Sequence, residues 1–281
     1  MTRQPDFTGV GIKIERAKHH FGDLEARIER FNQPEPYRIP SYCELDTGDV
    51  VSRFEVTEQP PLLWGAIAGD CVHNLRSSLD LLVCEMIRAE GRLVEKHHRF
   101  PVFRDETAYA NAFKPGPPRQ IGGIPKCAVD LIKDAKSYNG ADNPFWRLHQ
   151  LDIEDKHKLL VPVGVAHKGT TNSYTLADVI AAYPDETTID IFEIPTAQSI
   201  GISVPRLAFP LKDGAEIYRV PANLRDNPLA QMNMDPEFRF DVAFGEVEVV
   251  EGEPIIPTLH RLIQFVEDFV KLFLPLFSQD S

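Results

Sequence analysis

Hydrophobic positions recur every three or four residues along much of the first 160 residues, which is the period of a helix with one buried face. This spacing predicts four helices, over Val10–Phe31, Pro61–Ala89, Pro125–Ala135 and Asn143–His157. Asn143 is a favourable N-cap and Pro144 a favourable first helical residue, so the start of the fourth helix is well marked. Near the other end of the chain, Thr258–Leu274 predicts a fifth helix.

A period of two residues, typical of strands with one buried face, appears elsewhere. Tyr37–Leu45 and Val50–Val56 flank the turn sequence Asp46-Thr47-Gly48-Asp49 and predict a hairpin. After the fourth helix five more strands are expected, over Leu159–Val165, Thr188–Ile194, Ile200–Leu207, Glu216–Val220 and Phe238–Val249. Pro162 and Pro205 favour edge positions for two of them, because proline cannot donate a hydrogen bond to a sheet.

Helices therefore dominate the first half of the chain and strands the second, and this order predicts an α+β fold. We expect a single α+β domain over residues 1–281. In this arrangement a helical part (about 1–158, with the hairpin at 37–57) packs on a mostly antiparallel sheet, and the sheet and the closing C-terminal helix occupy about 159–277.

The most apolar segment, Leu259–Phe277, is interrupted by Arg261, Glu267, Asp268 and Lys271. A membrane-spanning helix needs about 20 mostly uncharged residues, so the segment predicts an amphipathic helix and no membrane anchor. Its apolar positions cover a broad part of the helix surface. We therefore expect part of this C-terminal helix to form the interface of a homodimer.

Net charge and cysteine content limit which binding partners and which cellular compartment are expected. The chain carries 30 Lys and Arg against 42 Asp and Glu, a formal net charge of −12, which disfavours DNA or a membrane surface held by general charge. The four cysteines, Cys43, Cys71, Cys84 and Cys127, form no C-x-x-C pair and show no zinc spacing. With an N-terminus that lacks the pattern of a secretory signal, they favour a reducing cytoplasm.

The long helix predicted over Pro61–Ala89 has two different sides. With about 100° between residues, one stripe gathers Trp64, Ala68, Cys71, Val72, Leu75, Leu79, Leu82 and Met86. The opposite side carries Asp70, His73, Ser77 and Asp80, followed one turn later by Leu81 and Cys84. A solvated face is the simpler interpretation. Leucine and cysteine are usually buried, however, so we expect a second packing partner that partly desolvates His73 and Asp80.

A second polar group lies on the helix predicted over Asn143–His157. His149, Asp152 and Lys156 fall within about one-sixth of the helix circumference, and His157 is roughly 80° from His149. A solvated helix end, whose cations suit the helix dipole, is one interpretation. In the other, these side chains form one wall of a polar cleft, and the His73 and Asp80 side of the long helix forms the other wall.

Two segments carry a resemblance to a known family. Gly69-Asp70-Cys71-Val72-His73-Asn74-Leu75-Arg76-Ser77-Ser78-Leu79-Asp80 is similar to a signature, Gly-Asp-x-x-His-Asn-Leu-Arg-Ser-x-Leu-Asp, of an uncharacterised family of bacterial and phage proteins. A second block typical of that family resembles Leu148–Leu160, with its Asp-Lys-His-Lys-Leu-Leu sequence. The resemblance covers at least residues 60–165 and implies no activity. It does imply that the two blocks belong together.

A weaker resemblance is to HEPN proteins, helical bundles that often act as metal-independent ribonucleases. Their motif places a histidine four to six positions after an arginine, with a polar residue next to the arginine. Arg92 and His97 have this spacing, but Leu93 replaces the polar residue and Gly91 is expected to end the helix before it. The match is therefore treated as chance, and no catalytic role is carried onto Arg92 or His97.

Three classes of function remain open. In the leading hypothesis the polar cleft binds a small ligand or serves an interaction. In the second, the protein is an HEPN-like, metal-independent ribonuclease that uses histidine as acid or base. In the third, it is a metal-binding hydrolase with His73, Asp80, His149 and His157 as the metal ligands. The candidate catalytic residues are His73, Asp80, His149 and His157. The candidates for binding a ligand or phosphate are Asp70, Asn74, Arg76, Asp152, Asp155 and Lys156. No cofactor is assigned, and no E-x-x-H or H-E-x-x-H motif supports a metal.

Overall fold

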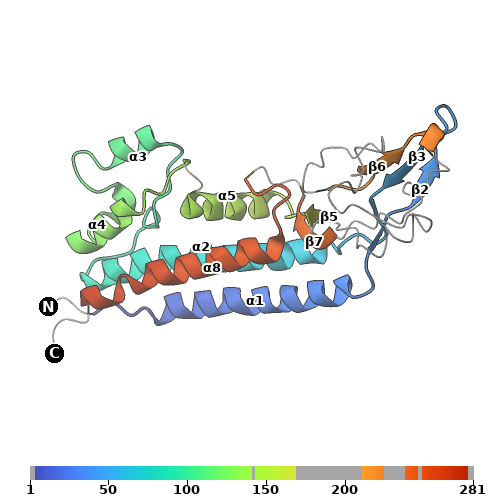
Figure 1. Cartoon of the computed structure of the whole chain (residues 1–281). Coiled ribbons are helices and arrows are strands. Elements are labelled where there is room, and N and C mark those ends of the chain that lie inside the picture. The colour runs from blue at the N-terminus through green and yellow to red at the C-terminus, as the bar shows by residue number, and fades with distance from the viewer. Residues whose placement is uncertain (1–3, 141–142, 169–210, 225–237, 246–248, 278–281) are drawn as a thin grey trace, which may run out of the picture. The chain divides into compact units, whose positions relative to one another are not determined.

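The structure is a computed structural model that describes residues 4–140, 143–168, 211–224, 238–245 and 249–277. Helices and antiparallel strands in these ranges confirm the predicted α+β class (Figure 1). The chain divides into two compact units. The helical unit comprises Met1–Ile28, Pro61–Pro162 and Phe244–Ser281, and the sheet unit comprises Glu29–Pro60 and Val163–Ala243. The grouping differs from the expected one: the hairpin belongs with the later strands, and the C-terminal helix belongs with the other helices.

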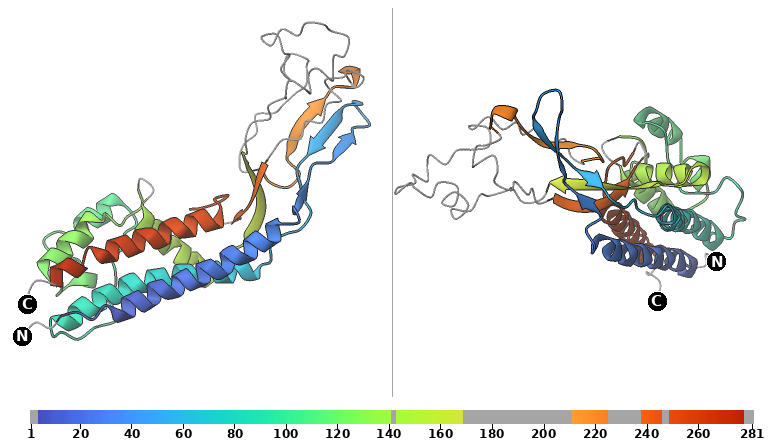
Figure 2. Two further views of the ribbon diagram at one scale, coloured as in Figure 1. Left: turned by 60° about the horizontal axis from the view of Figure 1, so that its bottom comes forward. Right: turned by 90° about the vertical axis from the view of Figure 1, so that its right-hand side faces the viewer.

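Four long helices form the core of the helical unit: α1 (Thr8–Asn32), α2 (Leu63–Ala89), α5 (Pro144–His157) and α8 (Ile255–Lys271). Each agrees with a helix predicted from the hydrophobic period, to within a few residues at its ends. α2 and α8 lie side by side, with α1 on one side of this pair and α5 on the other (Figures 1 and 2). α1 is tied to α2 by Lys13 and Asn74 and to α8 by Lys18 and Glu267.

α2 is the central helix of this unit, as the apolar residues on both of its sides predicted. All eight residues of its predicted core stripe are buried, from Trp64 to Met86. The helix α2 ends at Ala89, two residues before Gly91. Gly91 has a φ of 69°, a left-handed conformation that glycine adopts easily. None of the helices in the described ranges is long and apolar enough to cross a membrane.

Shorter helices complete the helical unit. α4 (Lys126–Asp134) was predicted, whereas α3 (Glu106–Ala112) and the 3₁₀ turns Arg119–Ile121 and Leu274–Phe277 were not. α3 buries none of its seven residues, so it has no apolar period to detect. Its one sequence signal is the N-cap Asp105, whose carboxylate accepts a hydrogen bond from the backbone N–H of Ala108 at 2.7 Å.

The sheet unit contains the predicted hairpin in two sections. β1 (Tyr37–Arg38) pairs antiparallel with β4 (Glu55–Val56), and β2 (Ser41–Cys43) pairs antiparallel with β3 (Val50–Arg53). β6 (Glu216–Val220) then pairs antiparallel with β3, which gives the order β2-β3-β6. β6 follows the predicted strand, and the 3₁₀ turn Ala222–Leu224 comes after it.

β5 (Pro162–Lys168) and β7 (Phe238–Phe244) form a separate two-stranded sheet. Pro162 begins β5, a position where its missing N–H costs nothing. Phe54, Leu211, Ile217 and Phe240 form the buried core of this unit, with Tyr37 stacked on Phe240 at a centroid distance of 5.6 Å. The strands expected over Thr188–Ile194 and Ile200–Leu207, with Pro205, lie outside the described residues.

Candidate functional site

The two motif segments lie against each other on α2 and α5, which run antiparallel. Two glycines on α2 allow this approach. A Cβ atom at Gly65 would lie 2.0 Å from the carbonyl oxygen of Leu160, and one at Gly69 would lie 1.8 Å from Oδ1 of Asp155. At Gly65 the neighbouring atom is backbone, so this position requires glycine for the packing, whereas at Gly69 the Asp155 side chain would have to move to admit a Cβ atom. One and two turns further along α2, polar side chains replace the glycines.

His73, Asp152 and Lys156 form the centre of this contact. His73 Nδ1 lies 2.9 Å from Asp152 Oδ1, and Lys156 Nζ donates to Asp152 Oδ2 at 2.5 Å. The Asp152 side chain is only 3% exposed, whereas those of His73 and Lys156 are 49% and 53% exposed. A buried carboxylate needs such partners, and it receives one on each oxygen. We call these three residues the His73–Asp152–Lys156 cluster.

The carboxylate also orients the imidazole. Asp152 accepts the proton of Nδ1, so in the neutral ring the lone pair is on Nε2. Nε2 lies 3.5 Å from Oγ of Ser77, one turn further along α2. The half-exposed ring therefore presents to a ligand a nitrogen that accepts a proton, or donates one when the ring is charged, next to a hydroxyl group.

Arg76, in contrast, is an internal anchor. Its side chain is 6% exposed, and its guanidinium donates to Asp80 Oδ1 at 2.5 Å and to the carbonyl of Phe100 at 3.0 Å. Asp80 also accepts from the backbone N–H of Phe100 at 2.9 Å. Arg76 and Asp80 thus fix the segment around Phe100 to α2. Asp80 is partly desolvated, as expected, with a side chain that is 38% exposed, and its partner is Arg76.

His149 lies beside this anchor. Its Nδ1 accepts a hydrogen bond from Nε of Arg76 at 3.4 Å, which requires the unprotonated nitrogen. Burial, followed by the positive charge of Arg76, lowers the pKa of His149 to about 4. His149 is therefore neutral near pH 7 and serves as an acceptor for Arg76, not as a general acid.

The remaining candidates lie at the edge of the cluster. Asp70 is exposed, and its backbone carbonyl accepts from Asn74 Nδ2 at 2.7 Å, while Asn74 Oδ1 accepts from Lys13 at 3.1 Å. Asn74 thus joins α1 to α2 and does not face α5. Asp155 packs on Gly69, and its pKa is raised by burial and then by the negative charges of Asp70 and Asp152.

His157 is the candidate that the structure does not bring to the others. It is the last residue of α5 and is exposed, and its side chain makes no hydrogen bond or ion pair with any residue in the described ranges. The expected group of facing imidazoles thus reduces to His73 and His149, which belong to different hydrogen-bond networks. Within the same ranges, no three His, Cys, Asp or Glu side chains are grouped so that they could hold a metal ion.

Sequence reasoning missed the contribution of Gly65, Gly69 and the Phe100 carbonyl. Small residues four apart on a helix are a signal of close helix packing that could have identified the two glycines. Ser77 was placed on the correct side of the helix, but its proximity to His73 depends on the histidine rotamer, which the sequence does not show. In comparisons with known proteins, no family model, no curated protein and no solved structure matched this chain.

Proposed function

We propose that the His73–Asp152–Lys156 cluster binds a small ligand that carries hydrogen-bond acceptors and one negative charge, such as a carboxylate or a phosphate monoester group. One observation carries this proposal. Both oxygens of the buried Asp152 are already occupied by His73 and Lys156, so the cluster turns mainly donors outward: the ammonium of Lys156, the hydroxyl of Ser77 and, when protonated, Nε2 of His73.

The surrounding charges favour a small ligand over a polyanion. Asp70, one turn before His73 on α2, and Asp155, which lies on α5 against Gly69, both act electrostatically on the same region. Arg76 is enclosed by its own partners and adds no binding surface for phosphate. A single acidic group at Lys156 meets one carboxylate, that of Asp152, which is already paired, whereas a nucleic-acid backbone would bring several more charges close to Asp70 and Asp155.

The experiment is a titration with inorganic phosphate and with acetate, followed by the NMR signals of the histidine ring C–H groups. His73→Gln identifies the signal of His73. We expect this signal to shift and saturate in the wild type, and Lys156→Gln to weaken the interaction several-fold. Lys158→Gln is the matched control, because it removes the same charge two residues further along, at the C-cap of α5, where Lys158 pairs with Glu154 at 3.6 Å. Equal effects of the two variants would refute the proposal.

Metal-independent acid–base catalysis, including ribonuclease activity, is the second candidate. The observation that favours it is the buried carboxylate behind a half-exposed imidazole, since such a pair fixes the ring orientation that a general base needs. Its test is cleavage of an RNA oligonucleotide in the presence of chelator. Cleavage that is lost in His73→Ala but kept in His157→Ala supports it, and cleavage that is unaffected by His73→Ala refutes it.

Two further proposals concern the setting of the protein. The contacts of Gly69 with Asp155 and of His73 with Asp152 join the two motif segments, which supports membership of the uncharacterised bacterial and phage family. None of the four cysteines, all of which lie in the described residues, forms a disulfide, which supports a reducing cytoplasm.

The proposed homodimer would use the end of the C-terminal helix. Leu272 and Leu274, at and beyond the end of α8, are 53% and 48% exposed. Exposed leucines next to a packed helix suit a contact with a second chain. Light scattering on dilute protein tests this, and a mass near 32 kDa would refute the dimer.

A further inference from the structure

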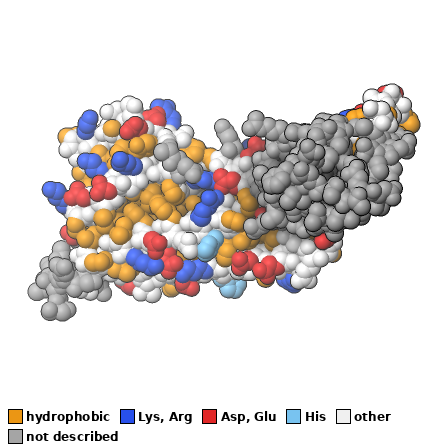
Figure 3. Space-filling model, viewed as in Figure 1, with side chains coloured by type: hydrophobic (Ala, Val, Ile, Leu, Met, Phe, Trp, Pro, Cys, Tyr) orange, Lys and Arg blue, Asp and Glu red, His pale blue; other side chains and the backbone are white. Residues whose placement is uncertain are grey.

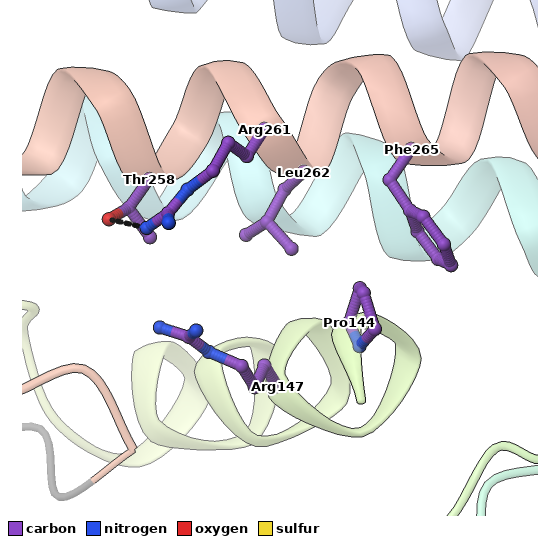
Figure 4. A pocket seen from close by; sticks show the side chains of 6 residues that line it. All are labelled: Pro144, Arg147, Thr258, Arg261, Leu262 and Phe265. Carbon is purple, nitrogen blue, oxygen red and sulfur yellow. Dashed lines mark hydrogen bonds between the residues drawn. The ribbon is translucent and has the colours of Figure 1, made fainter. Parts of the chain in front are cut away.

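A cavity of about 210 Å³ lies between α5 and α8, apart from the His73–Asp152–Lys156 cluster (Figure 4). Its lining residues are Pro144, Arg147, Thr258, Arg261, Leu262 and Phe265. The two ends of the cavity differ in chemistry. Arg147, Arg261 and Thr258 lie together at one end, whereas Pro144 and Phe265 lie at the other, with Leu262 between them (Figure 4).

The basic end already binds a carboxylate of the protein itself. Arg147 Nη2 donates to Glu253 Oε1 at 2.5 Å, Arg261 Nη2 donates to Glu253 Oε2 at 3.1 Å, and Thr258 Oγ1 lies 2.9 Å from the same Oε2. Glu253 thus demonstrates that these two arginines suit a carboxylate. Two guanidinium groups and one carboxylate leave one positive charge at this end of the cavity.

Arg261 is the group that a ligand can reach. Its side chain is 63% exposed, compared with 11% for Arg147. Towards the described residues, Arg261 donates through Nη2 only, to Glu253 and to Thr258. A guanidinium has five N–H groups, so the other edge of Arg261 can still bind a carboxylate from solution. Glu253 and Thr258 hold Arg261 in place.

The apolar end has room for a ring. A cavity of about 150 Å³ lined by hydrocarbon is enough to bind benzene, so 210 Å³ accommodates a benzene-sized body together with a carboxylate. Phe265 and Leu262 offer apolar contacts for such a body. On the face shown in Figure 3, hydrophobic side chains also form a continuous area around α8, bordered by charged residues.

We propose that this cavity is a second ligand site, which takes a small organic acid with a compact apolar body, such as an aromatic monocarboxylate. The carboxylate pairs with Arg261 and the body lies against Leu262, Phe265 and Pro144. Binding needs no change of fold, because Glu253 stays on Arg147.

The test is a titration of the full-length protein with phenylacetate, followed by the methyl NMR signals of Leu262 and Thr258. We expect saturable shifts, with a dissociation constant in the millimolar range or below. Acetate, which lacks the apolar body, and benzyl alcohol, which lacks the charge, should each bind at least about tenfold more weakly, a difference of about 1.4 kcal/mol.

Two substitutions in the cavity and two outside it locate the site. Arg261→Gln should weaken phenylacetate binding about tenfold or more, and Phe265→Ala should weaken it as well. Lys271→Gln, which removes an exposed charge from the same helix, should leave the affinity unchanged within twofold. His73→Gln should also leave it unchanged, so failure of the anion site on α2 and α5 would not affect this result. No shift in the wild type, or equal affinity in Arg261→Gln, would overturn the proposal.

Discussion

His73 and Asp152 are 79 residues apart in the chain, and their side chains meet at 2.9 Å between α2 and α5. The carboxylate is buried and the imidazole is half exposed. This difference in burial gives the pair its chemical character. The inner residue is fixed by its partners, and the outer residue is held in one orientation while it remains accessible to a ligand.

The coupling between these two residues should be measurable as stability. We expect Asp152→Asn to lower the free energy of unfolding by about 1 kcal/mol at pH 7, because it weakens bonds to both His73 and Lys156. In a double-mutant cycle with His73→Gln, the coupling energy should be about 0.5–1.5 kcal/mol. Glu154→Gln, on the same helix, provides the control and should show no coupling to His73. Denaturant unfolding of the four variants measures each value.

The close packing at Gly65 predicts that alanine substitutions at two glycines change the stability in opposite directions. Gly65→Ala should destabilise the protein by about 2 kcal/mol, because the new Cβ meets the backbone oxygen of Leu160 at 2.0 Å and the backbone must move. Gly22→Ala, within α1, has no atom within 4 Å of the new Cβ and should stabilise by up to about 1 kcal/mol through helix propensity. Two changes of the same sign in thermal or chemical unfolding would contradict the packing of α2 against the segment after α5.

Arg76 should not tolerate its conservative replacement. Arg76→Lys cannot reach Asp80, Phe100 and His149 together, so it leaves buried polar groups without partners and should cost about 3 kcal/mol. Arg88→Lys, further along α2, is the matched control. Arg88 is 52% exposed and pairs with Glu85, so its replacement should change the unfolding free energy by less than about 0.5 kcal/mol.

His149 gives a pH dependence with a definite sign. Its pKa is about 4 in the folded protein and about 6.5 in an unfolded chain. Between these values the unfolded state binds more protons, so stability falls as the pH decreases from 6.5 towards 4. Because His149 is partly exposed, we expect it to account for about 1 kcal/mol of the stability lost between pH 7 and pH 5.

His149→Gln should remove this part of the acid sensitivity. His157→Gln, at the exposed end of the same helix, should keep the pH dependence of the wild type. Urea unfolding at pH 7 and pH 5 compares the three proteins. A wild type and a His149→Gln variant that lose the same stability would contradict the burial of His149 next to Arg76.

The sequence predicted the helices better than the partners of their side chains. The period of three to four residues identified α1, α2, α5 and α8, and it separated the buried stripe of α2 from its polar side. The identity of the partners depends on helix register, which a single sequence does not contain. His73 was therefore grouped with Asp80, which lies about two helical turns further along the same side of α2. The structure instead pairs His73 with Asp152 on α5.

The same limit explains the difference between the two histidines of α5. A helical wheel places His149 and His157 near one stripe, because it records angle and not position along the axis. His149 contacts α2 through its hydrogen bond with Arg76, whereas His157 lies at the exposed end of α5. Arg76 was a candidate for binding phosphate for a similar reason: its charge is visible in the sequence, but its enclosure by Asp80 and the Phe100 carbonyl is not.

The central claim is that Asp152 orients the imidazole of His73 and leaves Nε2 as the reactive nitrogen. The most direct measurement is the ¹⁵N chemical shift of both ring nitrogens of His73, in protein labelled at histidine and kept at a pH where the ring is neutral. We expect a protonated Nδ1 and an unprotonated Nε2 in the wild type, and loss of this preference in Asp152→Asn. A proton on Nε2 in the wild type, or identical spectra of the two proteins, would contradict the claim.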